Sequence, residues 1–130
     1  MIWIQLYITN MARINNSGSS EPVKERLVVI SCNLHGFNQG VTGLQNLIVT
    51  LCPDVIMLPE HWLSADNLTN LCKVSGKYFV FGSSAMDDRL AAGPLIGRPF
   101  GGTAMLINKK TCQSHRYTLH CRALLYYICR

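Results

Sequence analysis

Acidic residues are missing from the last third of this 130-residue chain. Residues 89–130 contain seven Lys or Arg and no Asp or Glu, whereas residues 1–88 contain five basic and seven acidic residues. The net charges of +7 and −2 sum to +5 for the whole chain. A basic segment of this kind favours contact with phosphates, and the alternative is an ordinary solvated face.

Several well-known site motifs are also absent. No G-x-S-x-G, P-loop or G-x-G-x-x-G sequence occurs, so nothing indicates a serine hydrolase elbow, a nucleotide phosphate loop or a dinucleotide fingerprint. The six cysteines include no C-x-x-C pair. Cys32 falls in an expected strand and Cys52 at an expected helix end, where cysteine behaves as a small apolar residue. We therefore expect free thiols in a reducing compartment and no disulfide framework.

No hydrophobic run is long enough to cross a membrane, which takes about 20 residues. The apolar start, Met1 to Thr9, has no basic residue before it and no small-residue cleavage site after it, so it is a poor signal peptide. We expect residues 1–20 to be an unstructured leader, residues 21–110 to form one domain and residues 111–130 to be a divergent tail. The expected location is intracellular, without a membrane partner.

Hydrophobic periodicity predicts strands separated by helices. Strands are expected at residues 26–32, 54–58, 77–81 and 102–107, with a further one around 114–119. An amphipathic helix is expected after a loop at 33–43, because apolar residues recur at helical spacing: Val41, Leu44, Leu47, Ile48 and Leu51. A shorter helix is expected from Ser64, and residues 83–99 should be an exposed loop. This order favours an α/β domain with a mixed sheet.

A polar residue follows each of the first two expected strands. Asn33 ends the first strand, and Glu60 comes just after the second. Since a helix separates them, the strands should be parallel neighbours whose carboxyl ends meet at one edge, where ligands bind in open α/β sheets. An amide and a carboxylate brought together there suit a hard metal ion or a phosphate. The structural alternatives are a turn-forming Asn33 and a Glu60 that caps the next turn.

Three segments in series carry a resemblance to a known family. They are V-I-S-C-N-L-H-G-F-N at 29–38, P-D-V-I-M-L-P-E-H-W-L at 53–63 and G-R-P-F-G-G-T-A-M-L at 97–106. In order and spacing, the chain resembles the endonuclease/exonuclease/phosphatase superfamily, which has the DNase I-like fold. Within it, the chain is most similar to the apurinic-type endonuclease of non-LTR retrotransposons and other reverse-transcriptase-bearing elements.

The resemblance implies a four-layer αββα sandwich with two packed sheets. It also implies a hydrolase that nicks DNA with Mg²⁺ or Mn²⁺, works without a small-molecule cofactor and acts in the nucleus. Asn33 matches the family's first active-site Asn, and Glu60 matches its metal-binding Glu. Gly101 and Gly102 match a double glycine with a structural role at the start of an interior strand.

The chain departs from the family at several points. Pro59 stands where the family usually has Gln, which removes one active-site amide. The later active-site Tyr, the Asp-x-Asn pair and the closing Asp-His pair do not occur. We therefore expect a partial sandwich from the amino-terminal half of such a domain, with little or no activity alone.

Several other residues are candidates for roles near this site. Arg98 could reach a DNA phosphate, with a solvated loop cation as the alternative. His61 could contact phosphate, and Trp62 could stack near the site, although a core position is favoured for Trp62. His115 and His120 have ligand-like spacing and Cys121 adjoins them, but without an upstream C-x₂-C pair we do not expect zinc.

Two alternative functions remain open from the residues alone. One is a phosphatase of the same superfamily that acts on lipid or inositol phosphates. The other is a non-catalytic remnant that binds nucleic acid. The sequence indicates neither a DNA target preference nor an oligomeric state.

Overall fold

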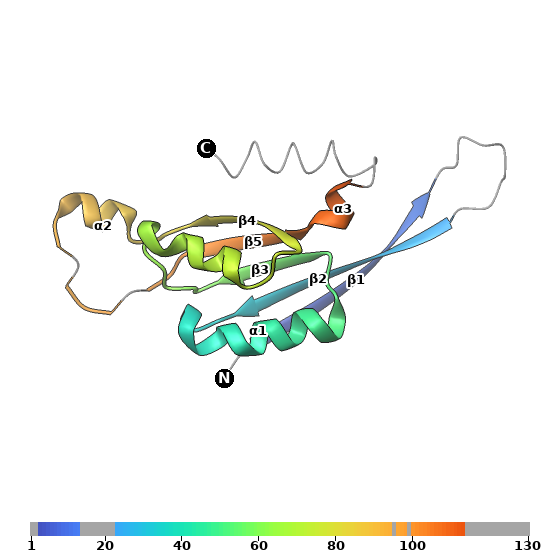
Figure 1. The fold of residues 1–130 in the computed structure, drawn as a ribbon, viewed down its shortest axis with the longest axis horizontal. Coiled ribbons are helices and arrows are strands. Elements are labelled where there is room, and N and C mark those ends of the chain that lie inside the picture. Colours follow the sequence, from blue (N-terminus) through green and yellow to red (C-terminus); the bar gives the residue numbers. More distant parts are fainter. Residues whose placement is uncertain (1–2, 14–22, 95, 99, 114–130) are drawn as a thin grey trace.

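The computed structural model describes residues 3–13, 23–94, 96–98 and 100–113. They form an α/β fold around one five-stranded mixed sheet (Figure 1). No helix in these ranges is both long enough and apolar enough to span a membrane.

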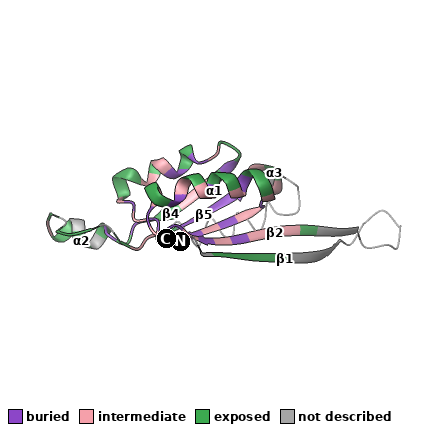
Figure 2. Ribbon diagram, turned by 90° about the horizontal axis from the view of Figure 1, so that it is seen from below, coloured by how far each residue is buried: buried purple, intermediate pink, exposed green. Residues whose placement is uncertain are grey.

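The sheet has the strand order β1-β2-β3-β5-β4. Its only parallel pair is β2 with β3, and the other neighbours are antiparallel. The strands are β1 (Trp3–Arg13), β2 (Val23–Asn33), β3 (Val55–Pro59), β4 (Tyr78–Ser83) and β5 (Thr103–Asn108). The long β1–β2 hairpin extends well beyond the other three strands (Figure 2).

The main helix, α1 (Phe37–Leu51), connects β2 to β3, and a 3₁₀ helix, η1 (Ala65–Lys73), precedes β4. Both lie on the same face of the sheet (Figures 1 and 2). Two short helices complete the described chain: α2 (Asp87–Ala92) lies away from the sheet, and α3 (Lys109–Gln113) follows β5 directly (Figure 1).

The hydrophobic core lies between the sheet and the two helices α1 and η1. Alternate strand residues such as Ile30, Ile56 and Leu106 are fully buried, as the period of two in a strand requires. Leu44 of α1 and Leu71 of η1 cover them and belong to the same apolar cluster. The predicted amphipathic helix and its inward face are therefore confirmed.

The four expected strands that fall within the described residues are present with small shifts in their bounds, and so is the parallel pair that α1 connects. The helix begins earlier than expected, at Phe37 rather than after residue 43. The glycines in this stretch indicated a loop, but Gly40 lies inside α1, where a Cβ would come within 2.7 Å of the Leu34 side chain. A residue that weakens a helix is used here because the helix packs closely on the chain before it.

Two expectations need correction. Residues 3–13 are not an unstructured leader, because they form β1 and pair with β2 along its whole length. Residues 83–99 are not wholly a loop, since α2 lies within them. The rest of the leader, the strand around 114–119, the tail beyond residue 113 and the His115, His120 and Cys121 group lie outside the described residues.

The other face of the sheet carries half-buried apolar side chains, among them Met57, Phe81 and Met105. Within the described ranges there is one sheet with helices on one side of it. The structure thus confirms a mixed-sheet α/β fold, and the four-layer sandwich stays a prediction.

Candidate functional site

The carboxyl ends of β2 and β3 lie side by side. Ser31 pairs with Met57 in parallel register, and the Leu34 amide donates to the Pro59 carbonyl at 3.4 Å. Beyond the strands, the Gly36 amide donates to the Glu60 carbonyl at 2.9 Å. These contacts bring the segments that carry Asn33 and Glu60 to the same edge of the sheet, as the strand pattern predicted.

The carboxylate of Glu60 is held from one side. Its Oε2 accepts hydrogen bonds from Trp62 Nε1 at 2.8 Å and from the Gly101 amide at 3.2 Å. Its Oε1 accepts none from the described residues. Two fixed donors therefore orient the half-buried carboxylate and leave one oxygen open, which is how outer-shell groups commonly position a metal ligand.

The backbone around Glu60 is in unusual conformations. Glu60 has φ +58°, Trp62 has φ +57° and His35 has φ +47°, although none of them is glycine. Such left-handed conformations cost energy in ordinary residues and cluster at functional sites. The segment after β3 is bonded on both sides. The Glu60 and Trp62 amides donate to Gly102 O and Gly101 O, both at 2.9 Å, and the Glu60 carbonyl accepts from the Gly36 amide.

Asn33 forms a turn, which was the structural alternative to a role in ligand binding. Its Oδ1 accepts a hydrogen bond from the His35 amide at 3.0 Å, which is an Asx turn. Its side-chain NH₂ has no acceptor among the described residues. Asn33 therefore ends the strand and still offers two hydrogen-bond donors at the edge that it shares with Glu60.

His61 points into the protein and is completely buried. Its Nδ1 accepts from the Leu63 amide at 3.0 Å, so its Nε2 carries the proton and donates to Ser83 O at 3.1 Å. Burial lowers the pKa of His61, against opposing contributions from the Ser83 and Thr103 backbone and the Glu60 charge. The expectation that His61 could contact phosphate is wrong because both ring nitrogens are used inside the fold.

A buried neutral histidine makes stability depend on pH. Because the pKa is lower in the folded state, the unfolded state binds more protons below its own pKa of about 6.5. We expect the free energy of unfolding to fall on acidification below pH 6.5, with a slope of at most about 1.4 kcal/mol per pH unit from this group. Urea denaturation at pH 7 and at pH 5 would measure it. If the free energy of unfolding falls by the same amount in His61→Gln, groups other than His61 cause the pH dependence.

Two glycines make room for the rings of this segment. A Cβ on Gly102 would come within 2.3 Å of the His61 ring, and one on Gly36 within 2.7 Å of the Trp62 ring. Trp62 is half-buried in this packing and is also bonded to Glu60. The double glycine was assigned a structural role from the resemblance, but nothing in the sequence indicated His61 as its partner.

Arg98 is exposed in the loop before β5. The described structure gives its side chain no hydrogen-bond or ion-pair partner. Phe100 of the same loop is covered by Arg89 of α2, whose guanidinium lies 4.8 Å from the ring centroid. The structure therefore leaves Arg98 available to a phosphate and does not bring it into contact with Glu60 or Asn33.

The amino end of α1 adjoins the same edge. The N-cap residue of α1 is Gly36, which has no side chain to cap the helix, and the first turn contains no acidic residue. No negative side chain of this turn therefore compensates the positive end of the helix dipole. A shallow pocket of about 180 Å³ lies between this first turn and His61, Trp62 and Leu63. The edge thus combines an open carboxylate oxygen, free amide donors and a helix amino terminus.

No group of three or more His, Cys, Asp or Glu that could hold a metal occurs among the described residues. Mg²⁺ nevertheless often binds through one or two carboxylates and keeps several waters, so Glu60 alone fits one side of such an ion. Comparisons with protein-family models, curated proteins and solved structures find no match to this chain. Function is therefore inferred from the residues and their geometry.

Proposed function

We propose that this chain is the amino-terminal part of a Mg²⁺-dependent DNA endonuclease domain of the DNase I-like type, from a retrotransposon-type reading frame. The observation that carries the proposal is the Glu60 carboxylate, whose Oε2 is held by Trp62 and Gly101 while its Oε1 stays open. The resemblance of three ordered segments around this residue supports the same function.

Each residue at the edge has a role in this proposal. Glu60 would bind the metal through its open oxygen. Asn33 would donate a hydrogen bond from its free NH₂ group to the scissile phosphate. The amino end of α1 has no side-chain cap and no acidic residue in its first turn, so its dipole favours the phosphate charge, although the Phe37 amide already donates to His61 O. A bound Mg²⁺ would stabilise the charge that develops on the transferring phosphoryl group. In the family the general base comes from a later motif, so the proposal gives this chain binding without efficient cleavage.

The open face of the sheet also fits the proposal. In a four-layer sandwich a second sheet covers this face, and its side chains pack on apolar residues such as Met57, Phe81 and Met105. Arg98 and the basic residues after position 88 then supply sequence-independent contacts to the DNA backbone.

Binding of duplex DNA tests the proposal. We expect the chain to retain DNA on a filter and to release it as salt rises. In Mg²⁺, Glu60→Gln should retain less DNA than the wild type, because Glu60 would hold a metal whose positive charge favours phosphate binding. In EDTA, the variant should retain as much or more, since it has lost one negative charge. Asp66→Asn, which removes an exposed charge on η1, is the matched control.

The same samples are assayed for plasmid nicking in Mg²⁺, and we expect none from the chain alone. Nicking that Glu60→Ala abolishes would show a self-sufficient enzyme and overturn the expected inactivity. Equal retention by wild type and Glu60→Gln in Mg²⁺ would instead favour a non-catalytic nucleic-acid binder.

A further inference from the structure

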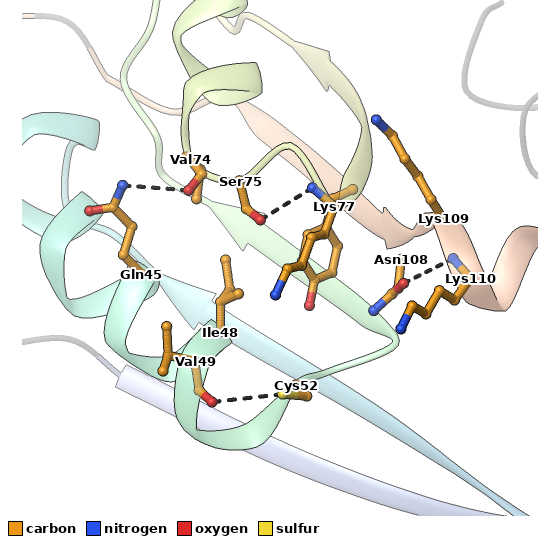
Figure 3. A pocket seen from close by; sticks show the side chains of 11 residues that line it. Gln45, Ile48, Val49, Cys52, Val74, Ser75, Lys77, Asn108, Lys109 and Lys110 are labelled. Carbon is orange, nitrogen blue, oxygen red and sulfur yellow. Dashed lines mark hydrogen bonds between the residues drawn. The ribbon is translucent and has the colours of Figure 1, made fainter.

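A second concave site lies at the opposite end of the sheet from Glu60. This groove has a volume of about 700 Å³ and lies between the carboxyl end of α1, the connection from η1 to β4, and the junction of β5 with α3 (Figure 3). It falls within the range of about 300–1,000 Å³ that is typical of small-molecule sites. Apart from the general basic charge after position 88, which includes Lys109 and Lys110, the endonuclease proposal uses none of its residues.

The walls of the groove are tied together by hydrogen bonds. Gln45 Nε2 of α1 donates to Val74 O at 3.4 Å, and Lys109 Nζ donates to Gly76 O at 2.8 Å. Lys109 also lies over the Phe79 ring, 5.5 Å from its centroid. These contacts connect α1 and α3 to the chain segment between them, so the groove is a built feature of the fold.

The two sides of the groove differ in chemistry. The α1 side is apolar and consists mainly of Ile48 and Val49, of which Val49 is 79% exposed. The opposite side carries Lys77, Lys109 and Lys110, and the described lining contains no acidic residue. Figure 3 shows these side chains around the opening, with Lys110 on the side away from the helix and Lys77 extending from the connection between η1 and β4.

Two of the three lysines are free to bind a ligand. The ammonium groups of Lys77 and Lys110 have no hydrogen-bond partner in the described part of the chain, whereas that of Lys109 is used within the fold. The neighbouring carboxylate of Asp54 is already engaged, because its oxygens accept from the Val28 amide and from Thr111 Oγ1. In the described part of the chain, Asp54 forms no ion pair with Lys77 or Lys110.

The polarity of α1 sets the direction of a ligand in the groove. α1 ends at Leu51, next to the groove, and the carboxyl end of a helix carries partial negative charge. An anionic group is therefore disfavoured beside the helix and favoured at Lys77 and Lys110. We propose that this groove binds a small organic anion whose phosphate or carboxylate lies between Lys77 and Lys110 and whose apolar body packs on Ile48 and Val49.

Calorimetric titration with octyl phosphate, below the concentration at which it forms micelles, tests the proposal. We expect octyl phosphate to bind at least about tenfold more tightly than 1-octanol or inorganic phosphate, because only it engages both sides of the groove. Octanoate is titrated alongside it, and its rank against octyl phosphate shows whether a carboxylate or a phosphate suits the lysines better. Octanol binding as tightly as octyl phosphate would overturn the proposal.

Variants at exposed positions separate charge from packing. The double change Lys77→Ala and Lys110→Ala should weaken octyl phosphate binding about tenfold or more. Lys73→Ala, which removes a lysine of η1 outside the groove, should leave the affinity unchanged. Val49→Glu should abolish binding by bringing a negative charge to the apolar wall, whereas Val49→Gln should weaken it less. Equal affinities of the double variant and Lys73→Ala would overturn the assignment.

Discussion

Gly102→Ala is expected to unfold this domain or to leave it only marginally stable. Gly102 has φ +83°, and a Cβ there would come within 2.3 Å of the buried His61 ring. The left-handed backbone costs an alanine about 1–2 kcal/mol. Forcing a methyl group into a packed interior adds about 1–3 kcal/mol. The sum is a large part of the 5–15 kcal/mol that is typical of small domains, and urea denaturation followed by circular dichroism would measure it.

Gly97→Ala is the matched control for Gly102→Ala. Gly97 also has a positive φ, of 106°, but a Cβ there would meet no atom within 4 Å. It should therefore show the backbone cost alone. In a His61→Ala background, the cost of Gly102→Ala should fall to that of Gly97→Ala, because the clashing ring has gone. Additive effects of the two changes would show that Gly102 and His61 do not constrain each other.

Glu60→Gln is expected to remove most of the affinity of the chain for Mn²⁺. The change keeps the shape of the side chain and removes the charge of the only ligand that we assign to the metal. We expect at least about a tenfold loss of affinity, which corresponds to about 1.4 kcal/mol. Electron paramagnetic resonance of free Mn²⁺, measured without DNA, would give both affinities.

Trp62→Phe tests how the Glu60 carboxylate is oriented. Phenylalanine keeps an aromatic ring against Gly36 but cannot donate the hydrogen bond to Oε2. Loss of an outer-shell partner typically costs about 10–100-fold in metal affinity, so we expect about a tenfold loss in Trp62→Phe and a larger loss in Glu60→Gln. Asp66→Asn removes an exposed carboxylate and should leave the affinity unchanged. Equal losses of Mn²⁺ affinity in Asp66→Asn and Glu60→Gln would show that negative charge in general attracts the metal. Glu60 would then not be a specific metal ligand.

Much of the fold was predictable from local pattern. The run from Leu27 to Cys32 is apolar except for Ser31, and the run from Val55 to Leu58 is wholly apolar. The helix between them indicated parallel strands. That pairing follows from chain connectivity, so the shared edge of Asn33 and Glu60 was predictable too. The sequence did not predict β1, because its apolar start precedes a polar stretch. Its strand conformation depends on pairing with β2 rather than on its own composition.

The details of the candidate site were not predictable in the same way. No spacing in the sequence indicates that Trp62 and Gly101 donate to one oxygen of Glu60, because Gly101 is 41 residues away along the chain. His61 was interpreted as a possible phosphate contact because it adjoins Glu60. Its burial follows from the left-handed backbone on both sides of it, which turns the ring towards Gly102.

The sequence by itself determined four of the strands and the main helix, and that Asn33 and Glu60 lie at one edge of the sheet. Those features depend on side-chain periodicity and on the order of elements, both of which are local. Only the tertiary structure decided which oxygen of Glu60 is open, that His61 is buried, and that Lys77 and Lys110 border the same groove. Each of these depends on residues far apart in the chain, whose contacts form only when the sheet and its helices pack together.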